Sequence, residues 1–288
     1  MGLALAVGLQ VLTGIAVLVI VSLGLAVVFG MMRVINLAHG EFMMLGAFAA
    51  VLATGAGLSL WLAMLVVAPV AVGLFGLVVE RLLIRRLYGR MVDTMLATWG
   101  LSLALVGGMT MLAGTSVAGV SAPLGSVAIG GFRTSGYELF LISAAAALSL
   151  GIWAVLRFTR WGLVARGTMQ DADTASALGV APDRVYAVTF AAGAALSGLA
   201  GALLAPLSGV VPTMGAAYIS RAFITVNTGG AAILAGTLTA SGLLGTVSTL
   251  GTFLSTPVLG EVAMLVVAVV LLRLLPRGIT GRVLRRSL

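Results

Sequence analysis

The sequence predicts an all-α, polytopic membrane protein with about eight or nine transmembrane helices. Of its 288 residues, 61% are hydrophobic and only 8% are charged, and the mean hydropathy is +1.21. Soluble domains carry about 25% charged residues. Apolar stretches long enough to cross a bilayer recur along the whole chain. In lipid, an α-helix satisfies all of its backbone N–H and C=O groups within one segment, so these stretches are expected to be helices. We therefore expect residues 1–288 to form a single transmembrane domain.

Nine apolar runs are candidates for these helices. Glycine and polar residues interrupt the second run and the last three, so some helices are expected to be broken or re-entrant. The first run lacks the positively charged start of a secretory signal, since the first charge is Arg33, and we expect it to be retained. The runs are Leu5–Phe29, Phe42–Thr54, Leu60–Val79, Met95–Leu112, Leu139–Leu156, Val188–Leu207, Tyr218–Ala235, Thr239–Phe253 and Val258–Leu275.

Arginine supplies all 16 basic residues, because the chain has no lysine. An excess of arginine in short loops marks the cytoplasmic side of a membrane protein. The clusters are Arg81, Arg85, Arg86 and Arg90; Arg157, Arg160, Arg166 and Arg184; and Arg273, Arg277, Arg282, Arg285 and Arg286. Alternating spans through them predicts an inner-membrane protein with its N-terminus outside and its C-terminus in the cytoplasm. Arg133, Arg221 and Glu261 then lie towards the outside, and the net charge of +8 reflects topology and anionic lipid rather than nucleic acid.

The composition also excludes several kinds of chemistry. No cysteine is present, so disulfides and thiolate metal sites are absent, and the single histidine, His39, has no second ligand to complete a metal site. Without lysine there is no Walker A loop, so energy from ATP must come from another subunit. No nucleophile–base–acid set emerges. We therefore expect no enzymatic activity, no cofactor and no metal.

Residues 157–186 form a polar insert between apolar runs, which we expect to be a cytoplasmic coupling loop. Within it, the spacing of Thr168 and Asp171 is typical of a helix start, and Gly179 followed by Pro182 is typical of a helix end. The pattern predicts one helix over Thr168–Leu178. Its apolar stripe consists of Met169, Ala172, Ala175 and Leu178.

That helix has two interpretations. Eleven residues at 1.5 Å each reach only about 16 Å, roughly half a bilayer, so the helix cannot span the membrane. It could be a loop that lies on the membrane surface, or a docking surface for a soluble protein. The stripe is made of small residues, whereas lipid-bound helices usually present Trp, Phe and Leu, and this favours docking.

Two polar interruptions lie within the apolar sequence, at Arg33–Phe42 and Thr225–Gly236. Paired interruptions in two halves of a transporter indicate a solute pathway, and ionisable groups at that depth are usually functional. The candidate pathway residues are Asn36, His39, Glu41, Asn227, Gly229 and Gly230. In the alternative interpretation, Arg33–Glu41 is a short cytoplasmic turn in which Asn36 caps the next helix and His39 has no chemical task. The outer loop Ala113–Glu138 is expected to be a flexible connection.

The segments GLAVVFGMMRVINLAHGEFMMLGAF (Gly24–Phe48) and Arg160–Pro206 closely resemble the permease subunits of branched-chain amino acid ABC importers, and the tail Leu274–Arg282 resembles their C-terminal ending. The resemblance extends over almost the whole chain. It implies a second related permease chain, two cytoplasmic ATP-binding subunits and an extracytoplasmic solute-binding protein. It also implies that a helix of the insert enters a groove on the ATPase, through residues that match Arg166, Gln170, Asp171, Ala175, Leu178 and Gly179.

Asp93–Leu105 and Val210–Val226 look closer to the urea-type branch of that family, and the chain departs from both branches at Asn227-Thr228 and at Ala231–Leu234. The resemblance therefore implies import of a small polar solute: a branched-chain amino acid, urea or a short amide. The alternative function is a stand-alone secondary transporter or a solute channel. An ion-coupled carrier would need buried ionisable residues, for which Glu41 is the main candidate, and a channel would not need the cytoplasmic helix.

Overall fold

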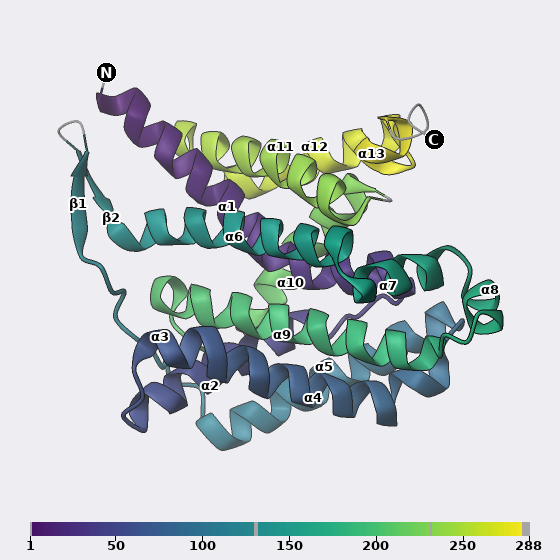
Figure 1. The fold of residues 1–288 in the computed structure, drawn as a ribbon. Coiled ribbons are helices and arrows are strands. Elements are labelled where there is room, and N and C mark those ends of the chain that lie inside the picture. The colour runs from purple at the N-terminus through teal and green to yellow at the C-terminus, as the bar shows by residue number, and fades with distance from the viewer. Residues whose placement is uncertain (1, 130–131, 231, 284–288) are drawn as a thin grey trace. The chain divides into compact units, whose positions relative to one another are not determined.

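The computed structural model describes residues 2–129, 132–230 and 232–283, and it confirms the all-α class (Figure 1). The expected arginines Arg285 and Arg286 and the departure at Ala231 lie outside the described residues. The helices are α1 (Gly2–Met32), α2 (His39–Gly55), α3 (Leu60–Leu62), the π-helix η1 (Ala63–Val67), α4 (Ala68–Leu82), the 3-10 helix η2 (Ile84–Leu87), α5 (Met91–Ala113), α6 (Gly136–Phe158), α7 (Arg160–Gln170), α8 (Ala172–Ala177), α9 (Pro182–Ser208), α10 (Met214–Gly229), α11 (Ile233–Leu254), α12 (Pro257–Leu274) and α13 (Gly278–Val283).

Within the described residues, seven helical spans are long and apolar enough to cross a membrane. They are Ala4–Met32, Leu60–Leu82, Met91–Ala113, Gly136–Phe158, Pro182–Ser208, Ile233–Leu254 and Pro257–Gly281. The second and seventh expected runs correspond to the shorter helices α2 and α10, of 17 and 16 residues. The boundary expected at Ala235 was wrong, because α10 ends at Gly229 and Gly230 follows with a φ of +85°. That left-handed conformation stops a helix.

The chain divides into two compact units. Unit 1 comprises Met1–Ser22, Ala122–Leu150 and Arg221–Leu288, and unit 2 comprises Leu23–Ser121 and Gly151–Ser220. Three helices, α1, α6 and α10, contribute residues to both units.

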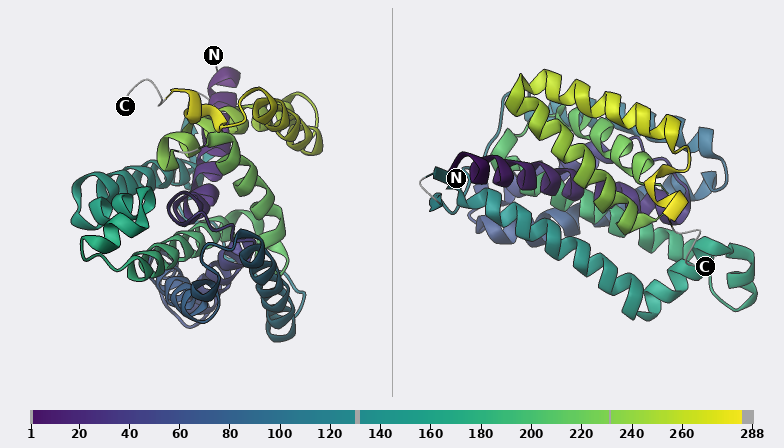
Figure 2. Two further views of the ribbon diagram at one scale, coloured as in Figure 1. Left: turned by 90° about the vertical axis from the view of Figure 1, so that its right-hand side faces the viewer. Right: turned by 90° about the horizontal axis from the view of Figure 1, so that it is seen from above.

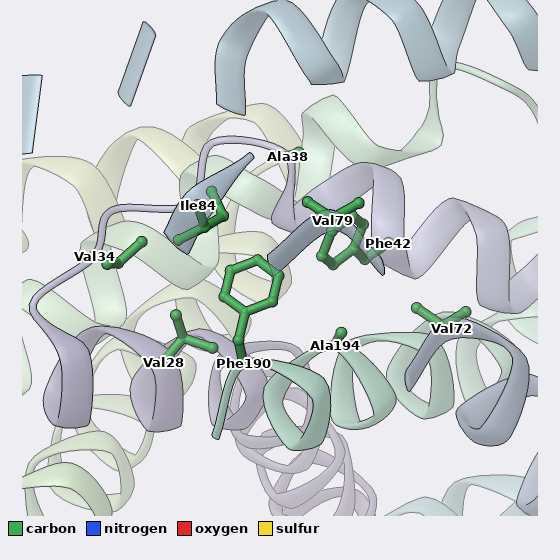
Figure 3. Packing of buried hydrophobic residues seen from close by; sticks show 9 residues of the cluster. All are labelled: Val28, Val34, Ala38, Phe42, Val72, Val79, Ile84, Phe190 and Ala194. Atoms are coloured by element: carbon green, nitrogen blue, oxygen red, sulfur yellow. The ribbon is translucent and has the colours of Figure 1, made fainter. Parts of the chain in front are cut away.

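In unit 2, α9 packs against α2 and α4 (Figure 1). Glycines let the backbones approach: a Cβ added to Gly201 would lie 1.8 Å from the Met43 carbonyl oxygen. Small residues at such contacts are the usual basis of close helix packing in membranes. A buried cluster fills the space between these helices, with Phe42 edge-on to Phe190 at 6.1 Å between ring centroids (Figure 3). This core positions the start of α2.

In unit 1, α11 and α12 lie side by side (Figure 2), and the first half of α1 approaches α11 closely. A Cβ added to Gly245 would lie 2.9 Å from Ile15 Cα. The buried residues of this unit include Leu18, Leu244, Met264 and Ala268. The unit also contains an antiparallel hairpin of β1 (Ser126–Ile129) and β2 (Phe132–Ser135), so the outer connection contains an ordered element.

Candidate functional site

The polar insert forms two helices, α7 and α8, and the prediction of one helix over Thr168–Leu178 was wrong. The break is at Asp171, whose backbone is extended (φ −155°, ψ 104°). Its carboxylate accepts hydrogen bonds from the backbone N–H groups of Asp173 and Thr174, each at 3.0 Å. Thr168 instead belongs to α7, where its hydroxyl donates to the Val164 carbonyl oxygen at 2.9 Å. Aspartate is among the strongest N-capping residues, and here it starts α8 itself.

α8 ends just before Gly179, where the sequence predicts a helix end. Gly179 has a φ of +85°, and the N–H of Val180 donates to the carbonyl of Ala175 at 3.0 Å. This is the glycine-based stop that closes many helices. Pro182 does more than prevent continuation, because it occupies the first turn of α9, where its missing N–H costs nothing.

The six predicted coupling residues are all brought together on α7, α8 and the turn after α8. Ala175 is buried, whereas Leu178 is 81% exposed. Arg166 is half-buried, with its Nε 3.3 Å from the Gly162 carbonyl oxygen that it donates to, and Gln170 is exposed. Hydrogen bonds from Thr174 lower the pKa of the Asp171 carboxyl. The insert therefore presents a short helix, α8, that is capped at both ends and is followed by an exposed leucine.

The sequence did not predict the contacts between the start of α9 and the segment after α4, which contains η2. Arg85 and Asp183 form an ion pair at 2.6 Å, and the hydrogen bond that Arg85 donates to the Asp183 carboxylate raises the pKa of the guanidinium. Nearby, the ring centroids of Tyr88 and Tyr186 are 5.0 Å apart. The Tyr88 hydroxyl donates a hydrogen bond to the Glu80 carboxylate, and burial raises the pKa of this hydroxyl. The sequence contained one indication of this ion pair: Arg85 and Asp183 have opposite charges and lie in two segments that were both expected on the cytoplasmic side.

Three of the predicted pathway residues, Asn36, His39 and Glu41, lie around the start of α2, and all three are buried. The Asn36 side-chain oxygen accepts the backbone N–H of Ala38 at 3.0 Å, which closes the turn that precedes the helix. His39 Nδ1 lies 2.9 Å from the Ser197 hydroxyl oxygen. One carboxylate oxygen of Glu41 has no hydrogen-bond partner within the described part of the chain.

The other three predicted pathway residues lie in unit 1, where α10 ends. Asn227 is half-buried. A Cβ on Gly229 would stand 2.5 Å from the backbone of Gly236, and the Gly229 carbonyl accepts a hydrogen bond of 2.6 Å from the Thr280 hydroxyl. Gly230 packs in the same way against Gly278. The break after α10 is therefore held by backbone contacts with α11 and α13.

A second glycine contact, also unpredicted, lies in unit 2. A Cβ on Gly40 would be 2.2 Å from the Gly215 carbonyl oxygen, so the first turns of α2 and α10 touch. Helix N-termini carry unpaired N–H groups and partial positive charge. Each helix follows a short connecting segment, and both are shorter than the membrane-capable spans. Nothing in the sequence indicated that Gly40 and Gly215 would be in contact.

Comparisons with known proteins agree with this architecture. Residues 8–275 match the family model described as branched-chain amino acid transport system / permease component. The chain is 29% identical over 282 residues to the high-affinity branched-chain amino acid transport system permease protein LivH of Escherichia coli (strain K12), covering 91% of both chains. It is 26% identical over 286 residues to the corresponding permease protein BraD of Pseudomonas aeruginosa, again covering 91% of both.

A more distant relative is the probable branched-chain amino acid transport permease protein LivH of Methanocaldococcus jannaschii, at 25% identity over 281 residues, covering 92% of this chain and 88% of the relative. No solved structure matches the chain significantly. The relatives are components of transport systems rather than enzymes, and the long apolar helices make the chain a multi-pass inner-membrane protein. The chain belongs to the branched-chain amino acid transport system permease component family and is a transmembrane permease subunit of an ABC importer.

Proposed function

We propose that this chain acts as one transmembrane domain that forms half of a pathway for branched-chain amino acids. The other half is a second, related permease chain, two cytoplasmic ATP-binding subunits supply the energy, and an extracytoplasmic binding protein delivers the solute. The names of the relatives in three species support this solute class over urea and short amides. The participation of α1, α6 and α10 in both units supports action as a single domain.

The single observation that carries the energy-coupling part is the capped turn of the insert. Asp171 and Gly179 fix both ends of α8 by hydrogen bonds and backbone geometry, and Leu178 projects from its end with 81% of its surface exposed. A short, rigid, locally stabilised helix can transmit a push from a partner, whereas a flexible loop would absorb it. We therefore assign residues 157–186 to the cytoplasmic face, with the N-terminus outside and the C-terminus inside.

Movement of α8 would reach the membrane through α9 and α4. α8 and α9 are separated by a short turn, and Arg85 with Asp183 connects α9 to the end of α4. Closure of the ATPases would then move these helices together, as a rigid-body rearrangement between inward-facing and outward-facing states. The candidate pathway residues Asn36, His39, Glu41, Asn227, Gly229 and Gly230 lie at the helix starts and breaks that such a movement would shift.

The test replaces the projecting leucine. Leu178→Arg should abolish co-purification of the ATP-binding subunits and ATP-dependent leucine uptake in proteoliposomes, because a charge replaces the apolar contact. The matched control is Leu58→Arg, which changes another exposed leucine, between α2 and α3. The control should retain both properties. Full assembly and uptake in the Leu178 variant would refute docking through α8.

A second candidate is an ion-coupled carrier that works without partners, and the unpaired carboxylate oxygen of buried Glu41 favours it. This candidate predicts leucine uptake by the purified chain alone, in liposomes with a proton gradient and no nucleotide. Glu41→Gln should abolish that uptake. The importer predicts no flux through the chain alone under these conditions.

A further inference from the structure

Unit 1 contains a cavity of about 400 Å³ between α1, α10, α11 and α12. This volume is within the range of roughly 300–1,000 Å³ that is typical of small-molecule sites. Apolar residues and groups with hydrogen-bonding capacity both line it. The lining includes Leu18, Arg221, Ser248, Thr249, Thr252, Glu261 and Met264.

The hydroxyl groups of this cavity are available to a ligand. Elsewhere on α11, Thr246 and Ser255 donate to the carbonyls of Gly242 and Gly251, each at 2.6 Å, as hydroxyls in apolar helices usually do. Within the described residues, the hydroxyls of Ser248, Thr249 and Thr252 make no intramolecular hydrogen bond. Three hydroxyls on two adjacent turns of α11 therefore have donors and acceptors that no protein group in the described part of the chain uses.

The cavity also contains both signs of charge. Arg221 of α10 donates a hydrogen bond to the carboxylate of Glu261 of α12, and the two side chains are 34% and 50% exposed. Charged groups on membrane helices avoid lipid and face water-filled cavities or polar partners. The guanidinium has five N–H donors and the carboxylate two oxygens, so the pair retains capacity for further bonds.

Glycine lets α1 pack closely against α11 at the edge of the cavity. A Cβ on Gly14, which also lines the cavity, would lie 2.2 Å from the Thr249 hydroxyl oxygen. Any side chain at position 14 would therefore collide with that hydroxyl. Apolar surface from Leu18 and Met264 completes the lining. The cavity thus combines paired charges, free hydroxyls and an apolar wall.

We propose that this cavity is a binding site for a zwitterionic α-amino acid with an aliphatic side chain. Arg221 binds the α-carboxylate through charge-assisted hydrogen bonds, and Glu261 binds the α-ammonium group. The hydroxyls of α11 complete the polar contacts, and Leu18 and Met264 contact the aliphatic side chain. The ligand exchanges one ion pair for two without changing the net charge of the site. This inference rests on the proposed function, and it adds the residues that select for a zwitterion.

The experiment measures equilibrium binding to the assembled importer in nanodiscs, without nucleotide and without the solute-binding protein, which would bind the solute itself. The probes are L-leucine, leucinamide, 4-methylpentanoate and urea. The wild type should bind leucine more tightly than leucinamide, which lacks the carboxylate, and than 4-methylpentanoate, which lacks the ammonium group. Equal binding of leucine and both analogues would overturn the proposal.

The variants separate the two charges. Arg221→Gln should weaken leucine binding by about tenfold or more and remove the preference over leucinamide, because a hydrogen bond to a charged group is lost. Glu261→Gln should weaken leucine binding to a similar extent and remove the preference for leucine over 4-methylpentanoate. Thr252→Val keeps the shape of the side chain and should weaken leucine binding by about threefold. Arg90→Gln, in the exposed pair with Asp93, is the matched control and should bind as the wild type.

Two outcomes separate this inference from the proposed function. In the first outcome, the wild-type complex takes up leucine with ATP, and Arg221→Gln, Glu261→Gln and Thr252→Val all bind leucine as the wild type does. This outcome would overturn the binding site and leave the importer function intact. Absence of ATP-dependent leucine uptake in the wild-type complex would overturn the proposed function. If Arg221→Gln fails to assemble, Thr252→Val, which leaves the ion pair untouched, decides the question.

Discussion

Gly40, at the start of α2, lies directly against Gly215, at the start of α10, so that a Cβ on Gly40 would stand 2.2 Å from the Gly215 carbonyl oxygen. The two first turns meet backbone to backbone, with no room for a side chain. Since Gly40 and Gly215 lie in the first turns of α2 and α10, this contact holds the starts of the two helices against each other.

The first prediction concerns this contact. Gly40→Ala should destabilise the protein by about 1–3 kcal/mol, because the added methyl must force two backbones apart. Gly55→Ala is the matched control in the same helix, since a Cβ there meets nothing within 4 Å. Thermal unfolding in detergent gives the comparison. Equal melting temperatures for the two variants would show that the helix starts are not in contact.

The second prediction concerns the cap of α8. Asp171→Ala should loosen α8 by about 1 kcal/mol, because two backbone N–H groups lose their acceptor. Asp171→Asn should retain most of the capping. Hydrogen–deuterium exchange over residues 172–177 measures the change. If the cap transmits work, leucine transported per ATP should fall in the alanine variant and be preserved in the asparagine variant.

The third prediction is the pH dependence of the same cap. Hydrogen bonds from Thr174 lower the pKa of Asp171 below that of the unfolded chain. A lowered pKa gives stability that is present above the ordinary aspartate value of about 3.9 and is lost as the pH falls through the lower, folded value. Exchange protection of α8 should therefore stay constant from neutral pH down to about 4 and decrease in more acidic solution. Asp171→Asn should remove this dependence. Protection already lost at pH 6 would contradict it.

The fourth prediction concerns Arg85 and Asp183. The side chains are 51% and 52% exposed, so the pair should contribute only about 0.2–1 kcal/mol to stability, decreasing with salt. Loss of the pair should nevertheless have a clear effect on coupling, measured as leucine transported per ATP. Arg85→Asp should reduce uptake per ATP, and the double reversal Arg85→Asp/Asp183→Arg should restore it. Reversal of the exposed pair Arg90 and Asp93 provides the control, with no change in uptake expected.

The fold class and most of the elements could be predicted from the sequence alone. Apolar runs such as Leu139–Leu156 and Val188–Leu207 correspond to α6 and α9, because a continuous apolar surface has no other stable arrangement in lipid. Gly179 was correctly predicted as a helix stop, since a left-handed backbone is a local preference of glycine.

The remaining features depend on contacts between elements that are far apart in the chain. Thr168 and Asp171 both suit a helix start, and the extended backbone at Asp171 selected the second of them. The contact of Gly40 with Gly215, and the assembly of Arg221 and Glu261 with the hydroxyls of α11, join residues that are far apart in the chain. Local patterns specify helices, whereas contacts between helices depend on how side chains of every neighbouring helix pack, and no short stretch of sequence contains that information.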